Sequence, residues 1–126
     1  MHVPRDRQKL GRVGEDIAAK YLAANGYTVL ARNYRRAGAE ADIVCRAPDG
    51  CLVFAEVKAR TFGTFGEGFE AVGRAKQKQI VRASLAYISE HMLLYDYVRY
   101  DVIIITLGHG KDGNTIDHLV NAFDAR

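Results

Sequence analysis

Residues 41–58 read ADIVCRAPDGCLVFAEVK, and this stretch decides the fold. Residues 41–47 and 51–58 are rich in β-branched and apolar side chains, which favours two strands. The Pro-Asp-Gly tripeptide at 48–50 is typical of a tight turn, because proline fixes φ and glycine adopts the left-handed conformation. The stretch therefore predicts an antiparallel hairpin.

The register of this hairpin brings charged side chains together. If residues 48–50 form a three-residue loop, Ala47 lies opposite Cys51. Counting five residues outward along each strand from this pair places Asp42 opposite Glu56. Directly opposed side chains have Cβ atoms about 4.5–5.5 Å apart, so two carboxylates repel there unless a cation lies between them. Because side chains alternate along a strand, Lys58 shares the face of Glu56, and Glu40 shares the face of Asp42. The opposite face is apolar and is expected to pack inward; it carries Ile43, Cys45, Val53, Ala55 and Val57.

This set of side chains suits phosphodiester hydrolysis. Mg²⁺ binds oxygen ligands and is commonly held by one or two carboxylates together with water and substrate phosphate. Asp42 and Glu56 are therefore candidate ligands for Mg²⁺ or Mn²⁺. A lysine beside the metal orients or deprotonates the attacking water and offsets the charge that develops on phosphorus, which is a role for Lys58. The alternative is a solvated hairpin face that carries only weak ion pairs.

The flanking segments predict an α/β domain of order αβββαβ, with a mixed central sheet flanked by helices. A helical pattern runs over 6–25 and ends at Gly26, and 27–34 is a strand. A loop over 60–70 carries three phenylalanines, which either stack on bases or dock on the core. A second helix runs over about 73–92, with Val81, Leu85, Ile88 and Met92 on one face. Residues 98–106 predict a strand covered on both sides, and a turn at 108–114 precedes a short strand at 115–123.

Several of these motifs together resemble a known family. The sequence looks like the YraN family of uncharacterised bacterial proteins. Six stretches carry this resemblance: GRVGEDIAAKYLAANGYTVLARNYR, GAEADIV, LVFAEVKAR, AVGRAKQKQI, VRYDVIII and HLVNAF. The resemblance spans about residues 11–123. It extends to the restriction-endonuclease-like PD-(D/E)XK superfamily, whose core has the same αβββαβ order and which includes the archaeal Holliday junction resolvases.

The resemblance implies a role for each matching residue. Asp42 and Glu56 would be catalytic metal ligands, and Lys58 would be the catalytic lysine. Glu15, on the first helix, would be a further acidic ligand, direct or through water. Glu40 would either contact the metal-binding residues without binding the metal itself, or form a salt bridge with Lys58.

Basic residues around this site are candidates for nucleic-acid contacts. On the second helix Lys78 and Arg82 share one face, whereas Lys76 and Gln79 lie on another flank and could reach the site. We expect phosphate contacts from six of these lysines and arginines: Arg35, Arg36, Arg60, Lys76, Lys78 and Arg82. The basic clusters around Arg32, Arg35 and Arg36 and from Lys78 to Arg82 are expected to form an electropositive rim beside the site. Arg99 and Asp101 indicate a structural ion pair. The histidines lack metal-ligand spacing, so no role is assigned to them.

Composition sets the limits of these hypotheses. A length of 126 residues fits one domain spanning residues 1–126. The net charge of +3 permits an anionic partner without requiring one. The two cysteines, Cys45 and Cys51, are expected to be buried reduced thiols. No apolar run approaches the roughly 18 residues that span a bilayer, and the N-terminus lacks a secretory signal, so we expect a cytoplasmic protein without a membrane partner.

The leading hypothesis is a Mg²⁺-dependent endonuclease that hydrolyses DNA rather than RNA, with branched or repair intermediates as candidate substrates. A second hypothesis is a non-catalytic nucleic-acid-binding module of the same fold, and a third is a structural protein whose charges are only surface. A pure binder would not need opposed carboxylates, because they repel phosphate. A homodimer is left open.

Overall fold

The computed structural model describes residues 7–61, 72–92, 94–108 and 113–125. The α/β class, the αβββαβ order and the final strand are confirmed. Most of the loop predicted at 60–70 and most of the turn predicted at 108–114 lie outside the described residues, and residues 60 and 61 continue a strand rather than beginning the loop. The elements are α1 (Arg7–Ala24), β1 (Thr28–Arg36), β2 (Ala39–Arg46), β3 (Leu52–Thr61), α2 (Arg74–His91), β4 (Val98–Leu107) and β5 (Thr115–Phe123).

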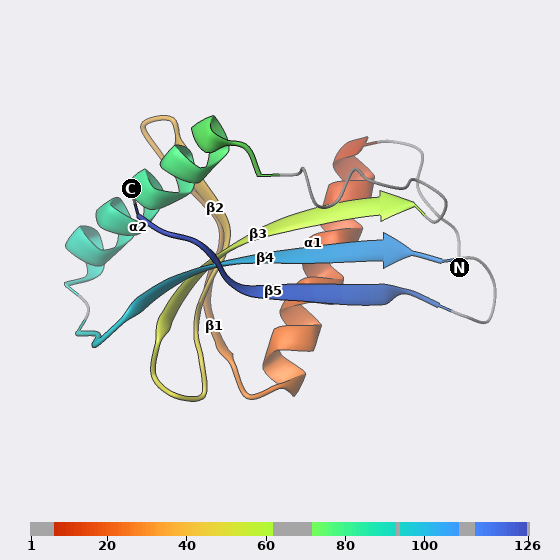
Figure 1. The fold of residues 1–126 in the computed structure, drawn as a ribbon, viewed down its shortest axis with the longest axis horizontal. Coiled ribbons are helices and arrows are strands. Elements are labelled where there is room, and N and C mark those ends of the chain that lie inside the picture. The colour runs from red at the N-terminus through yellow and green to blue at the C-terminus, as the bar shows by residue number, and fades with distance from the viewer. Residues whose placement is uncertain (1–6, 62–71, 93, 109–112, 126) are drawn as a thin grey trace.

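The strands form one mixed sheet in the order β1-β2-β3-β4-β5 (Figure 1). β3 and β4 run parallel, and the other neighbours are antiparallel. Parallel neighbours need a connection that returns the chain to the same end of the sheet, and α2 lies in that connection. β4 is buried from Tyr100 to Leu107 between β3 and β5, as the sequence predicted.

The hairpin between β2 and β3 has the predicted three-residue loop. Gly50 adopts a φ of 91°, and the Ala47 N–H donates to the Cys51 carbonyl at 2.8 Å. The ladder pairs Arg46 with Leu52 and continues to Ile43 opposite Ala55. The register inferred from the loop length is therefore confirmed.

The two helices cover opposite faces of the sheet. The apolar hairpin face packs with Ala18 and Leu22 of α1, and Val44 and Phe54 on the other face pack with α2. In Figure 1, α1 lies behind β3, β4 and β5, whereas α2 lies beside β2. The hairpin face that carries the acids is therefore partly covered by α2, and is not the open solvated face of the alternative interpretation.

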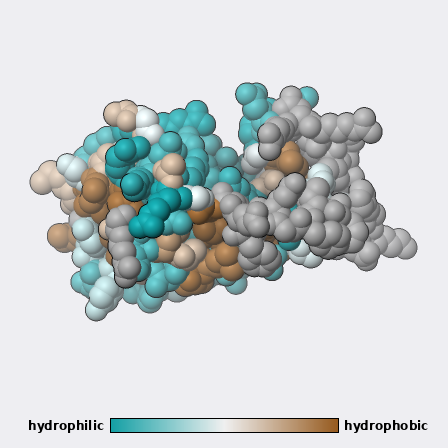
Figure 2. Space-filling model, turned by 45° about the horizontal axis from the view of Figure 1, so that its top comes forward, coloured by the Kyte–Doolittle hydropathy of each residue, from teal (hydrophilic) through white to brown (hydrophobic). Residues whose placement is uncertain are grey.

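The apolar stripe predicted for α2 is wrong in part. Leu85 is 63% exposed and Met92 is 86% exposed, and Figure 2 shows apolar side chains among hydrophilic ones on the α2 side of the molecule. The helix instead packs against the cluster around Phe54 with Ile80, two small residues and a tyrosine ring. The buried residues of α2 are Ile80, Ala83, Ser84 and Tyr87.

A glycine lets α1 approach β3 very closely. A Cβ added to Gly14 would lie 2.6 Å from Cβ of Ala59, a distance at which something must move. Ala59 follows Lys58 in the chain, so this contact fixes α1 beside the charged end of β3.

Two further expectations concern the whole molecule. Cys45 and Cys51 are buried free thiols, as predicted. Among the described residues, neither helix has the length and apolarity needed to cross a bilayer.

Candidate active site

Asp42 and Glu56 meet where β2 and β3 separate. The last backbone pair of the ladder is Ile43 with Ala55, and Asp42 and Glu56 are the next residue on each strand. Oδ2 of Asp42 accepts a hydrogen bond from the Val57 N–H at 2.8 Å, so a carboxylate takes the place of a strand partner. The two carboxyl groups interact directly. This juxtaposition was predicted from the hairpin register.

Glu56 is a buried acid in an unfavourable environment. The residue is only 3% exposed, and its Oε2 is buried without a hydrogen-bond partner among the described residues. Burial, followed by the neighbouring Asp42 carboxylate, raises the pKa of Glu56 to about 8. A buried charged oxygen without a partner costs folding free energy, so Glu56 needs a proton or a cation near neutral pH.

Two lysines approach Glu56 from different elements. Nζ of Lys58, on β3, lies 4.0 Å from Oε1 of Glu56, and Nζ of Lys76, on α2, lies 3.8 Å from the same oxygen. Lys58 keeps 38% of its side chain exposed, whereas Lys76 keeps 25%. The two ammonium groups therefore differ in access to solvent and to a substrate.

Lys76 also forms a charged hydrogen bond with Glu40. This bond lowers the pKa of Glu40 against the opposing effect of burial. Burial lowers the pKa of Lys76, but Glu40 and Glu56 outweigh it and raise the pKa overall, so the amine stays charged. Lys76 was predicted to reach the site as well as to contact phosphate, and the first expectation is confirmed, because α2 directs its ammonium group to Glu40 and Glu56. The alternative of a Glu40–Lys58 salt bridge needs correction, because Glu40 pairs with Lys76 and Arg35 among the described residues.

Glu15 reaches the site from α1. Its Oε1 is buried, and no described residue gives it a hydrogen bond. Burial, and next the Asp42 carboxylate, raise the pKa of Glu15, against a hydrogen bond with the Asn33 side chain. Asn33 lies on β1 between residues that pair with Ile43 and Ala41, which places it across from Asp42.

Sequence reasoning missed Asn33. Its φ is 52°, a left-handed conformation that asparagine tolerates better than most residues. The sequence did contain an indication of this residue, because asparagine is uncommon inside a strand pattern.

The donor set fits a divalent cation of the magnesium type. Within the described ranges, no three His, Cys, Asp or Glu side chains converge as a ready-made metal centre. Mg²⁺ needs only one or two carboxylates, because water and phosphate supply its other ligands. Asp42 and Glu56 offer such a pair, and the buried Oε2 of Glu56 lacks a partner among the residues described.

The arginines predicted to bind phosphate are engaged with protein groups. Arg35 pairs with Glu40 at 3.4 Å, although 73% of its side chain is exposed. Arg36 pairs with Glu90 at 2.7 Å, and Nε of Arg60 donates to Oγ1 of Thr106 at 2.9 Å. The predicted electropositive rim is thus partly neutralised on β1.

The basic residues of α2 remain candidates for phosphate contacts. Lys78 and Arg82 are exposed, and Gln79 is half-buried. Lys78 lines a surface hollow of about 190 Å³ together with Arg74, Gln77 and Asp124.

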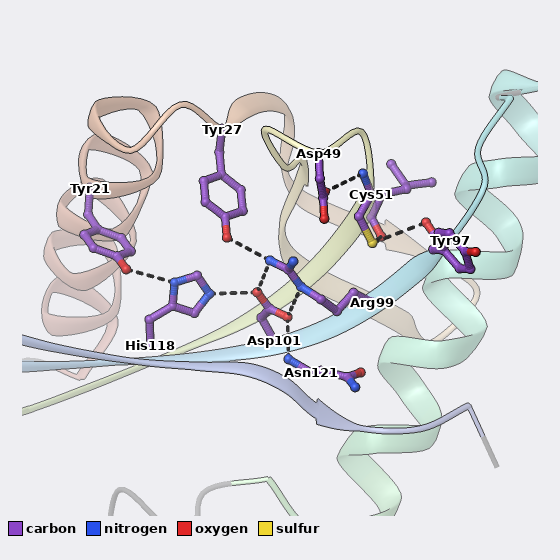
Figure 3. Close-up of polar contacts among 10 residues, drawn as sticks. Tyr21, Tyr27, Asp49, Cys51, Tyr97, Arg99, Asp101, His118 and Asn121 are labelled. Carbon is purple, nitrogen blue, oxygen red and sulfur yellow. Dashed lines mark hydrogen bonds and ion pairs between the residues drawn. The ribbon is translucent and has the colours of Figure 1, made fainter.

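A second buried charged cluster lies on β4 and β5 (Figure 3). Both oxygens of Asp101 accept from Arg99 at 2.9 Å, and Oδ1 also accepts from the Asn121 N–H at 3.0 Å. Nε2 of His118 lies 2.7 Å from Oδ2 of Asp101. Burial raises the pKa of Asp101, but His118, Arg99 and the Asn121 N–H outweigh burial and lower it. The predicted Arg99–Asp101 ion pair is confirmed, and we call this group the Asp101 cluster.

His118 was wrongly left without a role. Its Nδ1 bonds to the Tyr21 hydroxyl at 2.9 Å, and Nη2 of Arg99 donates to the Tyr27 hydroxyl at 2.8 Å, so the cluster ties α1 to the sheet. Strand alternation was the signal, because His118 shares the inward face of β5 with Ile116.

Comparison with known protein sequences identifies the family of this chain. The sequence model of a family described as "Uncharacterised protein family UPF0102" matches residues 14–105. A UPF0102 protein of Trichlorobacter lovleyi is 42% identical over 122 residues, which are 97% of this chain and 95% of the relative. A UPF0102 protein of Pelobacter propionicus is 43% identical over 120 residues, which are 94% of this chain and 85% of the relative. A UPF0102 protein of Geobacter sulfurreducens is 44% identical over 116 residues, which are 91% of this chain and 88% of the relative.

The chain therefore belongs to the UPF0102 family. This membership confirms the family resemblance found in the sequence motifs.

Proposed function

We propose that the protein is a metal-dependent endonuclease that hydrolyses DNA phosphodiesters, with Mg²⁺ or Mn²⁺ as cofactor. One observation carries the proposal. Glu56 is 3% exposed and follows the last ladder pair on the strand beside Asp42, and its Oε2 has no hydrogen-bond partner within the described part of the chain. A structural role would favour an apolar residue or a fully paired acid at this position, whereas a cation-binding role uses this arrangement.

The residues divide the chemistry between them. Asp42 and Glu56 would hold the cation, which would polarise the phosphate and activate water when bound. Lys58 orients or deprotonates the attacking water, and its ammonium group offsets negative charge that develops on the phosphate oxygens. Glu15 serves as a further ligand, direct or through water. Its partly buried carboxylate near Asp42 supports this role.

The resemblance to the PD-(D/E)XK superfamily supports DNA as the substrate, with branched or repair intermediates as the class to test first. Phosphate affinity would come from Lys78 and Arg82 on α2, which are exposed. Arg35 can join them, because its ion pair with Glu40 is solvent-exposed and such pairs are weak. The two free thiols, Cys45 and Cys51, suit a reducing compartment, so we place the activity in the cytoplasm.

The test is a cleavage assay on single-stranded, duplex, flap and four-way-junction DNA with Mg²⁺ or Mn²⁺. We expect cleavage of at least one substrate, and DNA binding that weakens steeply as salt rises. Salt-sensitive binding in Ca²⁺ without any cleavage would instead support the non-catalytic binding module. Neither binding nor cleavage would contradict both functions.

A further inference from the structure

One cation of the acidic site has no place in the chemistry assigned above. The Lys76 ammonium lies between two carboxylates, bonded to Glu40 and 3.8 Å from Oε1 of Glu56. It comes from α2, whereas both carboxylates come from the β2–β3 hairpin. With 25% of its side chain exposed, Lys76 is less available to a substrate than Lys58.

We propose that Lys76 is a built-in counter-cation, which holds the acidic site together without metal and competes with the divalent cation for Glu56. This inference rests on the proposed metal site and adds a residue that sets its affinity. Lys76 acts as a positioning residue, because it works through the two glutamates.

The charges of the site explain why a counter-cation is needed. Asp42 and Glu56 interact directly, and Glu40 belongs to the same hairpin face. Without a positive charge these carboxylates repel one another and destabilise the end of the hairpin. An ammonium group nearby relieves the repulsion, and for the same reason it makes the site less attractive to a second cation.

The unequal contacts of Lys76 show how it can yield to a metal. Its bond to Glu40 is a direct charged hydrogen bond, whereas its contact with Glu56 is a looser 3.8 Å approach. Glu40 therefore anchors the ammonium group, so that Lys76 can keep its Glu40 bond while Glu56 turns to the metal. Removing Glu40 would release Lys76 to pair fully with Glu56.

Two substitutions should therefore change metal affinity in opposite directions. Lys76→Met removes the competing charge, so Mg²⁺ should bind about fivefold to tenfold more tightly, while the metal-free protein melts at a lower temperature. Glu40→Gln leaves Lys76 free to pair with Glu56, so Mg²⁺ should bind more weakly. General damage to the fold would weaken binding in both variants, which separates it from the proposed role.

The experiment is calorimetric titration of Mg²⁺ into the full chain at pH 8.5, where protons compete little with the metal, together with thermal unfolding without metal. The variants are Lys76→Met, Glu40→Gln and a control, Lys20→Met, which removes an exposed lysine of α1. Lys20→Met should leave Mg²⁺ affinity unchanged. If Lys76→Met does not fold, Lys76→Gln removes the same charge with a smaller change in polarity.

The outcomes separate this inference from the proposed function. If the wild type binds Mg²⁺ and removing the Lys76 charge leaves the affinity equal or weaker, the counter-cation role is wrong and the metal site stands. If the wild type binds no Mg²⁺, the metal site itself is wrong. Tighter binding in the Lys76 variant together with weaker binding in Glu40→Gln supports the counter-cation role.

Discussion

Two buried acids on adjacent strands face opposite electrostatic environments. Asp101 on β4 is fully buried, and Glu56 on β3 is 3% exposed. Asp101 is bonded by Arg99, His118 and a backbone N–H, and its pKa is lowered despite burial. Glu56 lies beside the Asp42 carboxylate, and burial and Asp42 outweigh two ammonium groups at 3.8 and 4.0 Å and raise its pKa to about 8. Similar burial therefore favours the charged form of the carboxyl group at Asp101 and the protonated or cation-bound form at Glu56.

The difference separates structural acids from candidate functional acids. The Asp101 cluster satisfies its charge internally, so it can hold α1, β4 and β5 together without a ligand. The Asp42–Glu56 pair leaves an oxygen without a partner among the described residues, so a ligand can complete it. Strongly perturbed acids with incomplete partners are typical of functional sites.

The largest expected effect comes from breaking the Asp101 cluster. Asp101→Asn leaves Arg99 without its carboxylate, and losing one partner of a buried ion pair costs about 3–5 kcal/mol. Glu56→Gln in metal-free protein at pH 8 should be neutral or stabilising, because it removes an unfavourable charge. Urea unfolding of both variants measures the difference. Equal destabilisation would contradict the contrast between the two acids.

A pH series sharpens the same contrast. A carboxyl group whose pKa is about 8 in the folded protein and 4.5 when unfolded destabilises the fold as pH rises through that window. We expect the metal-free wild type to lose about 3 kcal/mol between about pH 5 and pH 8. Glu56→Gln should remove most of this loss, whereas histidine titration remains in both proteins. Parallel stability curves for the two proteins would refute the assignment.

Lys58→Ala tests whether the Asp42–Glu56 site carries out catalysis. The rate of DNA cleavage should fall on the order of 10² or more, which is about 2.7 kcal/mol, with DNA and metal binding retained. Lys58→Arg should rescue poorly, because it keeps the charge but does not deprotonate water. Asp42→Asn should also lose metal affinity. The measurement is a cleavage assay with titrated Mg²⁺, together with a check that each variant is folded. A Lys58→Ala variant as active as the wild type would show that Lys58 has no role in the mechanism.

The smallest expected effect concerns the packing of α1. Gly14→Ala places a Cβ 2.6 Å from Ala59, so α1 must shift, at a cost of about 1–2 kcal/mol. The shift also moves Glu15 relative to Asp42. Gly11→Ala is the matched control, because its added Cβ would meet no atom within 4 Å apart from its chain neighbours and the nearby backbone of α1, and it should stabilise by up to about 1 kcal/mol. Thermal unfolding compares them, and equal melting temperatures would contradict the close approach.

The parts of this protein that local rules govern were predictable from sequence. The turn at Gly50 fixed the hairpin register, and the register with strand alternation placed Asp42 beside Glu56. The apolar run of β4 predicted a central strand. Each of these inferences depends only on residues that are close in the chain.

The parts that depend on packing were not predictable. The sequence predicted that Lys76 could reach the site, but its bond to Glu40 depends on how α2 lies on the sheet. The partner of Arg36 is Glu90, 54 residues away. His118 meets Tyr21 across 97 residues. The sequence pattern contains no distance information at that range.

Counting bound Mn²⁺ by electron paramagnetic resonance shows directly whether Asp42 and Glu56 hold a divalent cation. We expect about one bound ion per wild-type chain, and loss of that ion in both Asp42→Asn and Glu56→Gln. Asp101→Asn, measured at a temperature where it is folded, should keep the ion, because its carboxylate belongs to the structural cluster. A wild type that binds no ion, or an Asp42→Asn variant that binds it as tightly as the wild type, would show that Asp42 and Glu56 do not form a metal site.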